Sequence, residues 1–219
     1  MDILRVGALG GLLGLDGTAV GQFMVSRPLV AGVLAGWMLG VPALGGLIGG
    51  ILEVYLLVSF PTGGARFPEG ATATVVAVAA AAPFDGAGVV PLGVAVGLVW
   101  GQIGGASVTA QRHLNSRLVP ESGDVAHDGS RVVVAHVAAI LLDFVRGTLV
   151  TMSGVIVGRV ALSWLTQHWP LSTGPSIGLV LVGGAVSAGV LLHDLGGFRK
   201  RRLWFVAGLA LGIVGTRFL

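Results

Sequence analysis

Two glutamates stand in an apolar part of the chain, where a carboxylate is costly. Glu53 interrupts the run "GGILEVYLLV", and Glu69 follows in the Pro- and Gly-rich stretch "FPEG". A carboxylate in apolar surroundings normally faces a partner or an aqueous path, so Glu53 either accepts hydrogen bonds from a polar substrate or pairs with an arginine such as Arg27. Taken alone, Glu69 is expected to be a solvated turn residue. Taken together, the two carboxylates suit a site that grips vicinal hydroxyls, as sugar sites do.

Two amides share this problem of buried polarity. Gln22 lies in "LDGTAVGQFMVSRP" and Gln102 in "VWGQIGG". Each amide has two N–H donors and a carbonyl acceptor, so it needs partners if it is buried. Asp16 stands in the same polar island as Gln22, and we expect it to cap the helix that follows, because Asp is a favoured N-cap residue.

A third polar group lies in the apolar run "AHVAAILLDFVRGTLV", which contains Asp143 and Arg146. Residues three apart are neighbours on one face of a helix. We therefore predict an ion pair between Asp143 and Arg146 with a structural rather than a catalytic role.

Other kinds of active site have no support in the sequence. No stretch matches the phosphate-binding pattern G-x-x-x-x-G-K-S/T. The five histidines lack metal-ligand spacing, there is no cysteine, and no nucleophile elbow is present. The basic residues are scattered at the ends of apolar segments, which does not indicate nucleic-acid binding. We expect no catalytic residue, no metal and no cofactor.

These residues must be positioned by membrane helices. The chain has 219 residues, of which 54% are hydrophobic and 11% are charged, far below the about 25–35% charged surface of a soluble domain. Several apolar runs approach the about 20 residues that cross a bilayer as a helix. The sequence therefore predicts an all-α, polytopic helical membrane protein in which some segments do not cross fully. The apolar runs are Ala31–Phe60, Ala71–Pro83, Val89–Gly101, Val132–Val160, Ser176–Leu192 and Leu203–Val214.

One of these runs is interrupted. Pro42, Pro61 and Pro68 each disfavour a continuing helix, and "PTGGARFPEG" is rich in turn residues. Irregular backbone at membrane depth is tolerated where protein or a wet cavity surrounds it, and broken segments are a common sign of a transporter binding site. We predict a broken, re-entrant helical hairpin that turns near Pro61–Gly70.

The whole chain, residues 1–219, is expected to form a single integral membrane domain. Its clearest break is the polar stretch Arg112–Arg131, which is either a solvated loop or a frayed extension of its helices. Cytoplasmic loops are enriched in Lys and Arg, so this stretch and the basic cluster Arg199–Arg202 are placed on the cytoplasmic side. Small residues about four apart, as in "GWMLGVPALGGLIGG", predict close helix packing.

The stretch "LDGTAVGQFMVSRPLVAGVLAGWMLGVPALGGLIGGILEVYLL" carries a family resemblance. Its D-x-T-A-x-x-Q-x-M-x-S-R-P start and its later G-x-x-x-E step resemble the membrane subunit IIC of the mannose/fructose/sorbose family of bacterial sugar phosphotransferase systems. "GQIGG" and "AHVAAILLDFVRGTLV" resemble later segments of that family.

The resemblance implies a sugar-translocating subunit in the bacterial cell (inner) membrane, with several passes. Such a subunit holds the sugar while a soluble IIB subunit phosphorylates it, and it is a non-catalytic permease subunit. Implied partners are the sugar, a IID-type membrane subunit, soluble IIA and IIB phosphocarriers and the lipid bilayer. The resemblance also implies an oligomer in which the complex is repeated around a threefold axis. By matching positions, the substrate-binding candidates are Gln22, Glu53, Glu69 and Gln102.

Two other functions remain open from the residues alone. One is a carrier or facilitator that moves a small polar solute without phosphotransfer. The other is a structural membrane subunit that stabilises a partner.

Overall fold

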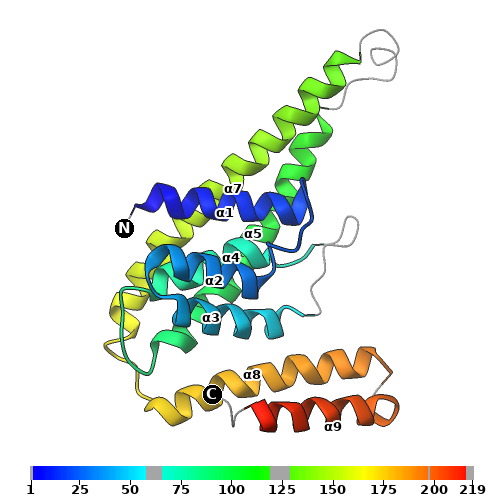
Figure 1. The fold of residues 1–219 in the computed structure, drawn as a ribbon. Helices are drawn as coiled ribbons and strands as arrows, with labels where there is room; N and C mark the ends of the chain where they lie inside the picture. Colours follow the sequence, from blue (N-terminus) through cyan, green and yellow to red (C-terminus); the bar gives the residue numbers. More distant parts are fainter. Residues whose placement is uncertain (1, 58–65, 119–128, 197, 216–219) are drawn as a thin grey trace.

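The computed structural model describes residues 2–57, 66–118, 129–196 and 198–215, and within these ranges the chain is helical with no strand. Figure 1 shows the helices in chain order. Their bounds are α1 (Ile3–Thr18), α2 (Pro28–Leu39), α3 (Pro42–Tyr55), α4 (Gly70–Ala81), α5 (Val89–Ser116), α7 (Ser130–Leu165), α8 (Thr173–Asp194) and α9 (Phe198–Gly215).

Three of these helices are long and apolar enough to cross a membrane. They are α5 with 28 residues, α7 with 36 and α8 with 22. At 1.5 Å per residue they extend about 42, 54 and 33 Å, against about 30 Å of hydrocarbon. The prediction of an all-α membrane protein is confirmed.

Three shorter apolar helices do not reach across by themselves. α2 and α4 have 12 residues each, and α3 has 14, so they extend about 18 to 21 Å. The predicted interruption is confirmed, because α3 ends at Tyr55 and α4 begins at Gly70. Arg66–Glu69 is non-helical, whereas residues 58–65, which include the predicted turn at Pro61, lie outside the described residues.

α2 and α3 form a tight hairpin. Proline occupies the start of each helix, where its missing N–H costs nothing, and Gly40 ends α2 with a left-handed φ of 77°. The two backbones touch, since a Cβ added at Gly32 would lie 2.4 Å from the carbonyl oxygen of Gly45. The predicted close packing through small residues is confirmed in this hairpin.

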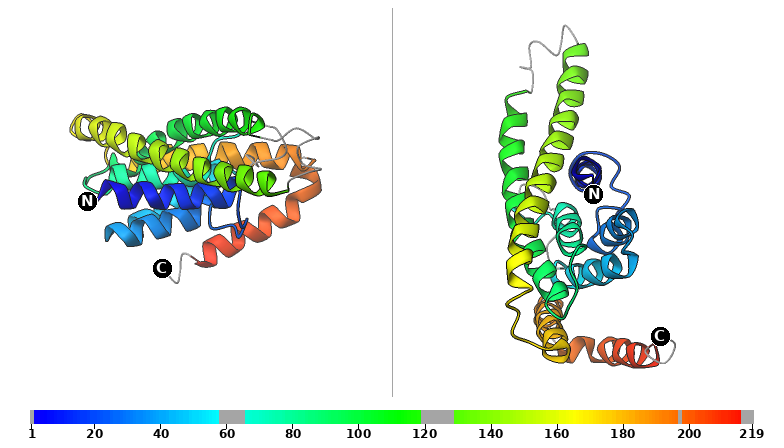
Figure 2. Two further views of the ribbon diagram at one scale, coloured as in Figure 1. Left: turned by 90° about the horizontal axis from the view of Figure 1, so that it is seen from above. Right: turned by 90° about the vertical axis from the view of Figure 1, so that its left-hand side faces the viewer.

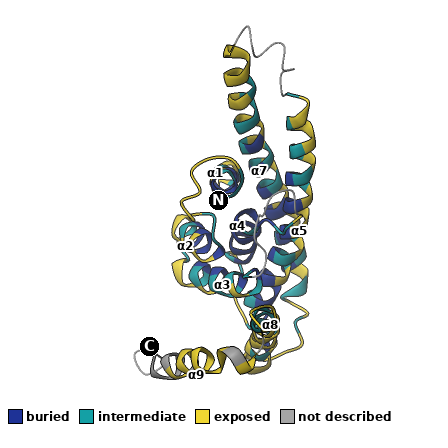
Figure 3. Cartoon of the chain, turned by 90° about the vertical axis from the view of Figure 1, so that its right-hand side faces the viewer, coloured by how far each residue is buried: buried dark blue, intermediate teal, exposed yellow. Residues whose placement is uncertain are grey.

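α4 lies at the centre of the bundle, and all its residues from Ala71 to Ala81 are buried. It packs against α1, α2, α3, α5 and α7, and Figure 3 shows it enclosed by them. Near its carboxyl end, the Nε of Arg159 on α7 donates to the carbonyl of Ala79 at 3.1 Å, a cation at the negative end of a helix.

The polar stretch Arg112–Arg131 joins α5 to α7 and is partly helical. α5 continues to Ser116 and α7 begins at Ser130, while residues 119–128 lie outside the described residues. In Figure 1 and in the left view of Figure 2, the end of α5, the start of α7, the end of α8 and the start of α9 all lie on the right-hand side of the bundle, the first two above and the last two below in Figure 1. The two basic stretches that the sequence assigns to one side of the membrane therefore lie on one side of the structure.

Candidate functional site

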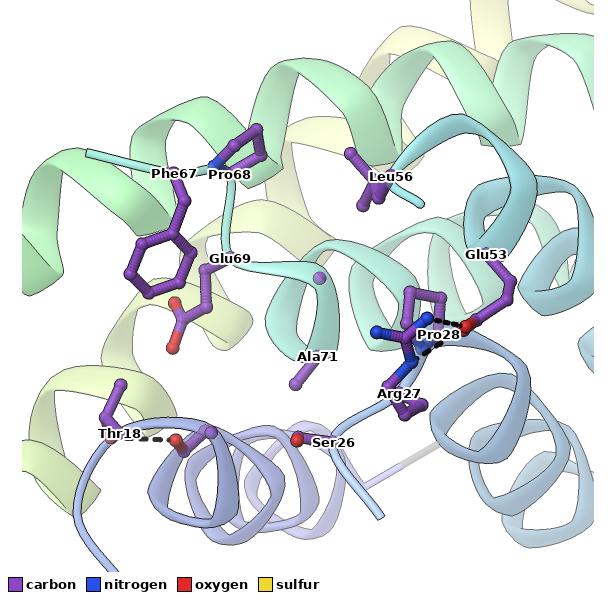
Figure 4. Close-up of a pocket in the computed structure, with 13 residues that line it drawn as sticks. Thr18, Ser26, Arg27, Pro28, Glu53, Leu56, Phe67, Pro68, Glu69 and Ala71 are labelled. Atoms are coloured by element: carbon purple, nitrogen blue, oxygen red, sulfur yellow. Dashed lines mark hydrogen bonds and ion pairs between the residues drawn. The ribbon is translucent and has the colours of Figure 1, made fainter. Parts of the chain in front are cut away.

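A cavity of about 80 Å³ lies where α2 and α4 begin and α3 ends. Figure 4 shows it between Glu53 with Arg27 on one side and Glu69 on the other. The structure thus brings together two of the four predicted site residues. This site cavity is lined by Gly14, Gly17, Thr18, Ser26, Arg27, Pro28, Glu53, Leu56, Phe67, Pro68, Glu69, Gly70 and Ala71.

Glu53 pairs with Arg27, which is one of the two alternatives open from the sequence. Arg27 Nε donates to Glu53 Oε1 at 2.7 Å, and Nη2 of the same arginine also donates to Oε1. The other oxygen, Oε2, accepts from the backbone N–H of Leu29 at 3.2 Å. Glu53 therefore places a carboxylate at the amino end of α2, where negative charge is stabilised. The pair stays accessible, with the side chains of Arg27 and Glu53 27% and 21% exposed.

Glu69 is not a solvated turn residue, so that expectation is wrong. It is 3% exposed, and both its oxygens accept from Arg146, Oε1 from Nη2 at 2.8 Å and Oε2 from Nη1 at 3.0 Å. Thr72 Oγ1 donates to Oε2 at 2.9 Å, and the Glu69 backbone N–H donates to the carbonyl of Gly101, also at 2.9 Å. The carboxylate is a buried ion-pair partner.

The glycines of "GQIGG" explain the burial of Glu69. A Cβ at Gly104 would lie 2.7 Å from Glu69 Oε2, and one at Gly105 would lie 1.9 Å from the carbonyl oxygen of Phe67. Because these positions on α5 have no side chain, the segment Phe67–Glu69 lies directly on the helix.

Arg146 joins Glu69 to a wider buried network. Its Nε donates to Asp143 Oδ1 at 2.7 Å, which confirms the predicted pair, and its Nη1 donates to Ser107 Oγ at 2.8 Å. The hydroxyl of Thr18 donates to the other oxygen of Asp143. The network connects α1, α4, α5 and α7.

Sequence reasoning missed the link between Arg146 and Glu69. The spacing of three residues already assigned Asp143 to Arg146, and the turn residues around Glu69 indicated a solvated side chain. The sequence therefore offered no signal for this contact between distant segments.

The two predicted glutamines lie elsewhere. Gln22 is exposed in the connection between α1 and α2, with a positive φ of 54°. Gln102 is exposed on α5 and lines a different cavity of about 340 Å³, which shares Phe67 and Pro68 with the site cavity. Neither amide lines the site cavity.

Asp16 does not cap the following helix. It lies in the last turn of α1, and the N-cap residue of α2 is Arg27. Its carboxylate accepts from the backbone N–H groups of Phe23 at 2.6 Å and Ser26 at 2.9 Å, and so fixes the loop that carries Ser26 to the cavity. Burial acts to raise its pKa, but the hydrogen bonds from Ser26 and Phe23 outweigh it and leave the pKa of this carboxyl below its usual range.

The lining suits hydrogen bonding to hydroxyl groups. An ionised carboxylate has about four acceptor positions, and the partly exposed Glu53 keeps accessible surface on the cavity, whereas the oxygens of Glu69 are held by Arg146 and Thr72. Thr18 and Ser26 add hydroxyls. Among the described residues, no group of three or more His, Cys, Asp and Glu side chains is placed to hold a metal ion.

Comparison with known proteins identifies the family to which the sequence is similar. A sequence model of the family described as "PTS system sorbose-specific IIC component" matches residues 1–188. A solved structure titled "Structure of membrane protein" has the same fold, with a TM-score of 0.71 and 18% identity over 99% of this chain and 91% of that chain. No curated protein matches the chain.

Proposed function

The chain belongs to the family of PTS sorbose-specific IIC components, and on this premise we propose that it is the sugar-translocating subunit of a phosphoenolpyruvate-dependent sugar phosphotransferase system. The observation that carries the proposal is the site cavity. Glu53 and Glu69 line it on opposite sides, and it lies at the ends of three helices that are too short to cross the bilayer.

In this proposal Glu53 is the main acceptor for sugar hydroxyls. Its Oε1 accepts charged hydrogen bonds from Arg27, and its partial exposure leaves it open to a ligand. Glu69 and Arg146 hold the opposite wall in place. The cavity of about 80 Å³ is smaller than the about 300 Å³ at the lower end of ligand pockets, so a hexose enters as the walls move apart.

The chain supplies binding, and the phosphoryl group comes from a soluble IIB subunit. The transfer breaks a phosphorus–nitrogen bond on a histidine of IIB and forms a phosphorus–oxygen bond to a sugar hydroxyl, whose proton is released. No side chain of the site cavity is assigned a covalent step.

The proposed location is the bacterial inner membrane, with several passes and with the basic end of the bundle in the cytoplasm. Lys and Arg favour the cytoplasmic side, and the connection between α5 and α7 and the start of α9 carry them at one end. The site cavity lies where α2 and α4 begin and α3 ends, and Figure 1 shows these helix ends on the right-hand side, as it does the end of α5 and the start of α7. A sugar bound there is within reach of a cytoplasmic IIB subunit.

The family implies partner subunits, and we propose a IID-type membrane subunit together with IIA and IIB in an oligomeric assembly. The spanning windows of α7 and α8 are 17% and 11% buried within the chain. Their apolar surfaces are therefore available to lipid and to neighbouring subunits.

The test is phosphoenolpyruvate-dependent phosphorylation of sugars by vesicles that contain the chain and its candidate partners. We expect sugar phosphate to accumulate inside the vesicles and Glu53→Gln to reduce it. Uptake of unmodified sugar would instead identify a facilitator and overturn the proposal.

A further inference from the structure

The basic cluster Arg199–Arg202 gives the start of α9 a clear excess of positive charge. Its four residues are consecutive, the first turn of α9 contains no acidic residue, and no acid follows Asp194 in the sequence. Asp194 itself ends α8 and lies 3.5 Å from Nδ1 of His193. Within the part of the chain that the structure describes, no carboxylate pairs with an arginine of this cluster.

The position of the cluster in its helix adds to this excess. The amino end of a helix carries a partial positive charge, so that cations are less stable there than at the carboxyl end. An external anion at this end interacts favourably with the side chains and with the first backbone N–H groups of the helix. The start of α9 therefore lacks internal compensation and is stabilised by a negatively charged partner.

An open groove of about 450 Å³ lies beside the cluster, between the end of α8 and the start of α9. One residue of the cluster, Arg201, contributes a guanidinium to the groove, and the other side chains of the lining are aliphatic or aromatic. The lining residues are Leu192, Leu195, Arg201, Trp204 and Phe205. The groove therefore joins one cationic group to apolar walls.

α9 projects away from the bundle. Of the described helices only α8 contacts it, and Figure 3 and the right view of Figure 2 show it extending away from the others. Leu203 and Trp204, which directly follow the cluster, are 78% and 76% exposed. Large apolar side chains exposed beside a cationic cluster in a membrane protein are expected to contact lipid.

The order of residues along α8 and α9 matches the layers of a membrane surface. α8 is long and apolar enough to cross a bilayer, and its last two residues are polar. The chain then turns at Gly196, whose φ is 95°, and α9 begins with the cluster before its sequence becomes apolar from Leu203 onward. Trp204 stands at this boundary, and Trp is enriched where membrane meets water.

We propose that the groove between α8 and α9 binds an anionic phospholipid of the leaflet that this end of the bundle faces. The phosphate group lies at Arg201, because a guanidinium matches phosphate oxygens, and the acyl chains lie against the apolar walls. Clusters of four or more Lys and Arg beside a membrane helix are typical of binding to anionic lipid. The groove lies beyond residues 1–188, which the family model matches.

An acidic surface of a soluble subunit is the competing partner for this cluster. The apolar walls of the groove and the exposed Leu203 and Trp204 favour lipid, because a polar protein surface leaves these side chains without apolar contacts.

The test titrates the purified full chain in neutral detergent with phosphatidylglycerol and measures the bound lipid by native mass spectrometry. Phosphatidylcholine with the same acyl chains, which has no net charge, and glycerol 3-phosphate, which has no acyl chain, are the comparison probes. We expect phosphatidylglycerol to bind about tenfold or more tightly than either probe. Glycerol 3-phosphate that binds as tightly as phosphatidylglycerol overturns the inference, because the apolar walls would then contribute nothing.

Arg201→Gln is expected to weaken the affinity for phosphatidylglycerol about tenfold, as for the loss of a charged hydrogen bond. Arg201→Lys, which keeps the charge, is expected to restore part of the loss. Arg117→Gln is the matched control, since Arg117 is an exposed arginine at the end of α5. Equal affinity of Arg201→Gln and Arg117→Gln overturns the inference.

Two further variants test the groove itself. Arg199→Gln removes a charge of the same cluster that does not line the groove, so a loss as large as that of Arg201→Gln shows diffuse attraction and overturns the site. If Arg201→Gln fails to fold, Trp204→Ala replaces it and is expected to weaken binding by removing an apolar wall. Trp37→Ala is its control, because Trp37 and Trp204 are both 76% exposed, and equal affinity of these two variants overturns the inference.

Sugar phosphorylation by the assembled system is measured with the same Arg201→Gln chain. A variant that binds phosphatidylglycerol as tightly as wild type but phosphorylates sugar more slowly assigns the cluster to a soluble subunit and overturns the lipid site. A variant with weakened lipid binding supports the site whether or not phosphorylation changes.

Discussion

Arg146 holds both carboxylate oxygens of Glu69, a residue 77 positions earlier in the chain, inside a bundle where their side chains are 8% and 4% exposed. Glu53 and Arg27 form the more open pair. The two acids at one cavity therefore have different roles, and the buried one belongs to the framework.

Glu69→Gln is expected to destabilise the protein. Asp143 still balances Arg146, so the loss is that of charged hydrogen bonds, about 1.5–3 kcal/mol in the free energy of unfolding. Thermal unfolding in detergent measures it, with Asp85→Asn, an exposed acid, as the control. A variant as stable as wild type would show that the ion pair contributes nothing to the fold.

Arg146→Gln is expected to cost more than Glu69→Gln, because it leaves two buried carboxylates, Glu69 and Asp143, without their cation. Removing one partner of a buried pair costs about 3–5 kcal/mol. The measurements are expression level and unfolding temperature beside Arg199→Gln, a change at an exposed arginine. The discriminating result is which variant, Arg146→Gln or Glu69→Gln, has the lower unfolding temperature. If Arg146→Gln is the less destabilised of the two, the buried network is contradicted.

Glu53→Gln is expected to leave the fold nearly intact and to weaken sugar binding. The pair with Arg27 is partly exposed, so its contribution to stability is about 1 kcal/mol or less. A lost charged hydrogen bond to the sugar reduces affinity about tenfold or more. Calorimetric titration with the transported sugar checks the prediction, and Asp2→Asn, at an exposed ion pair with Arg5, is the control. Unchanged sugar affinity would remove Glu53 from the site.

Gly105→Ala is expected to displace the segment Phe67–Glu69 and so to lower both stability and sugar binding. The new Cβ would stand 1.9 Å from the Phe67 carbonyl oxygen, and such overpacking costs about 1–3 kcal/mol. Gly178→Ala is the matched control on α8, where nothing lies within 4 Å of the added atom. If both alanine variants melt at the wild-type temperature, the close approach at Gly105 is not needed.

The sequence predicted the features that depend on neighbouring residues. Hydropathy identified the spanning helices, the prolines marked the interruption between Tyr55 and Gly70, and the spacing of three gave the pair of Asp143 with Arg146. Each rests on local periodicity or turn chemistry.

Features that depend on packing were beyond local reasoning. Glu69 is buried because Gly104 and Gly105 let its segment lie on α5, which is a contact between distant parts of the chain. Gln102 belongs to the same helix but points to another cavity, since its position around the helix relative to its neighbours decides which face it occupies. Gln22 lies in a loop whose course is fixed by Asp16.

The two arginines of α7 also constrain how this protein can move. Arg146 holds the residue before α4, and Arg159 holds the carbonyl of Ala79 near its other end. The rise along α7 from Arg146 to Arg159 is about 20 Å, and the length of α4 is about 18 Å. The two arginines of α7 therefore contact α4 near both of its ends. We therefore expect α4 and α7 to move together as one rigid body.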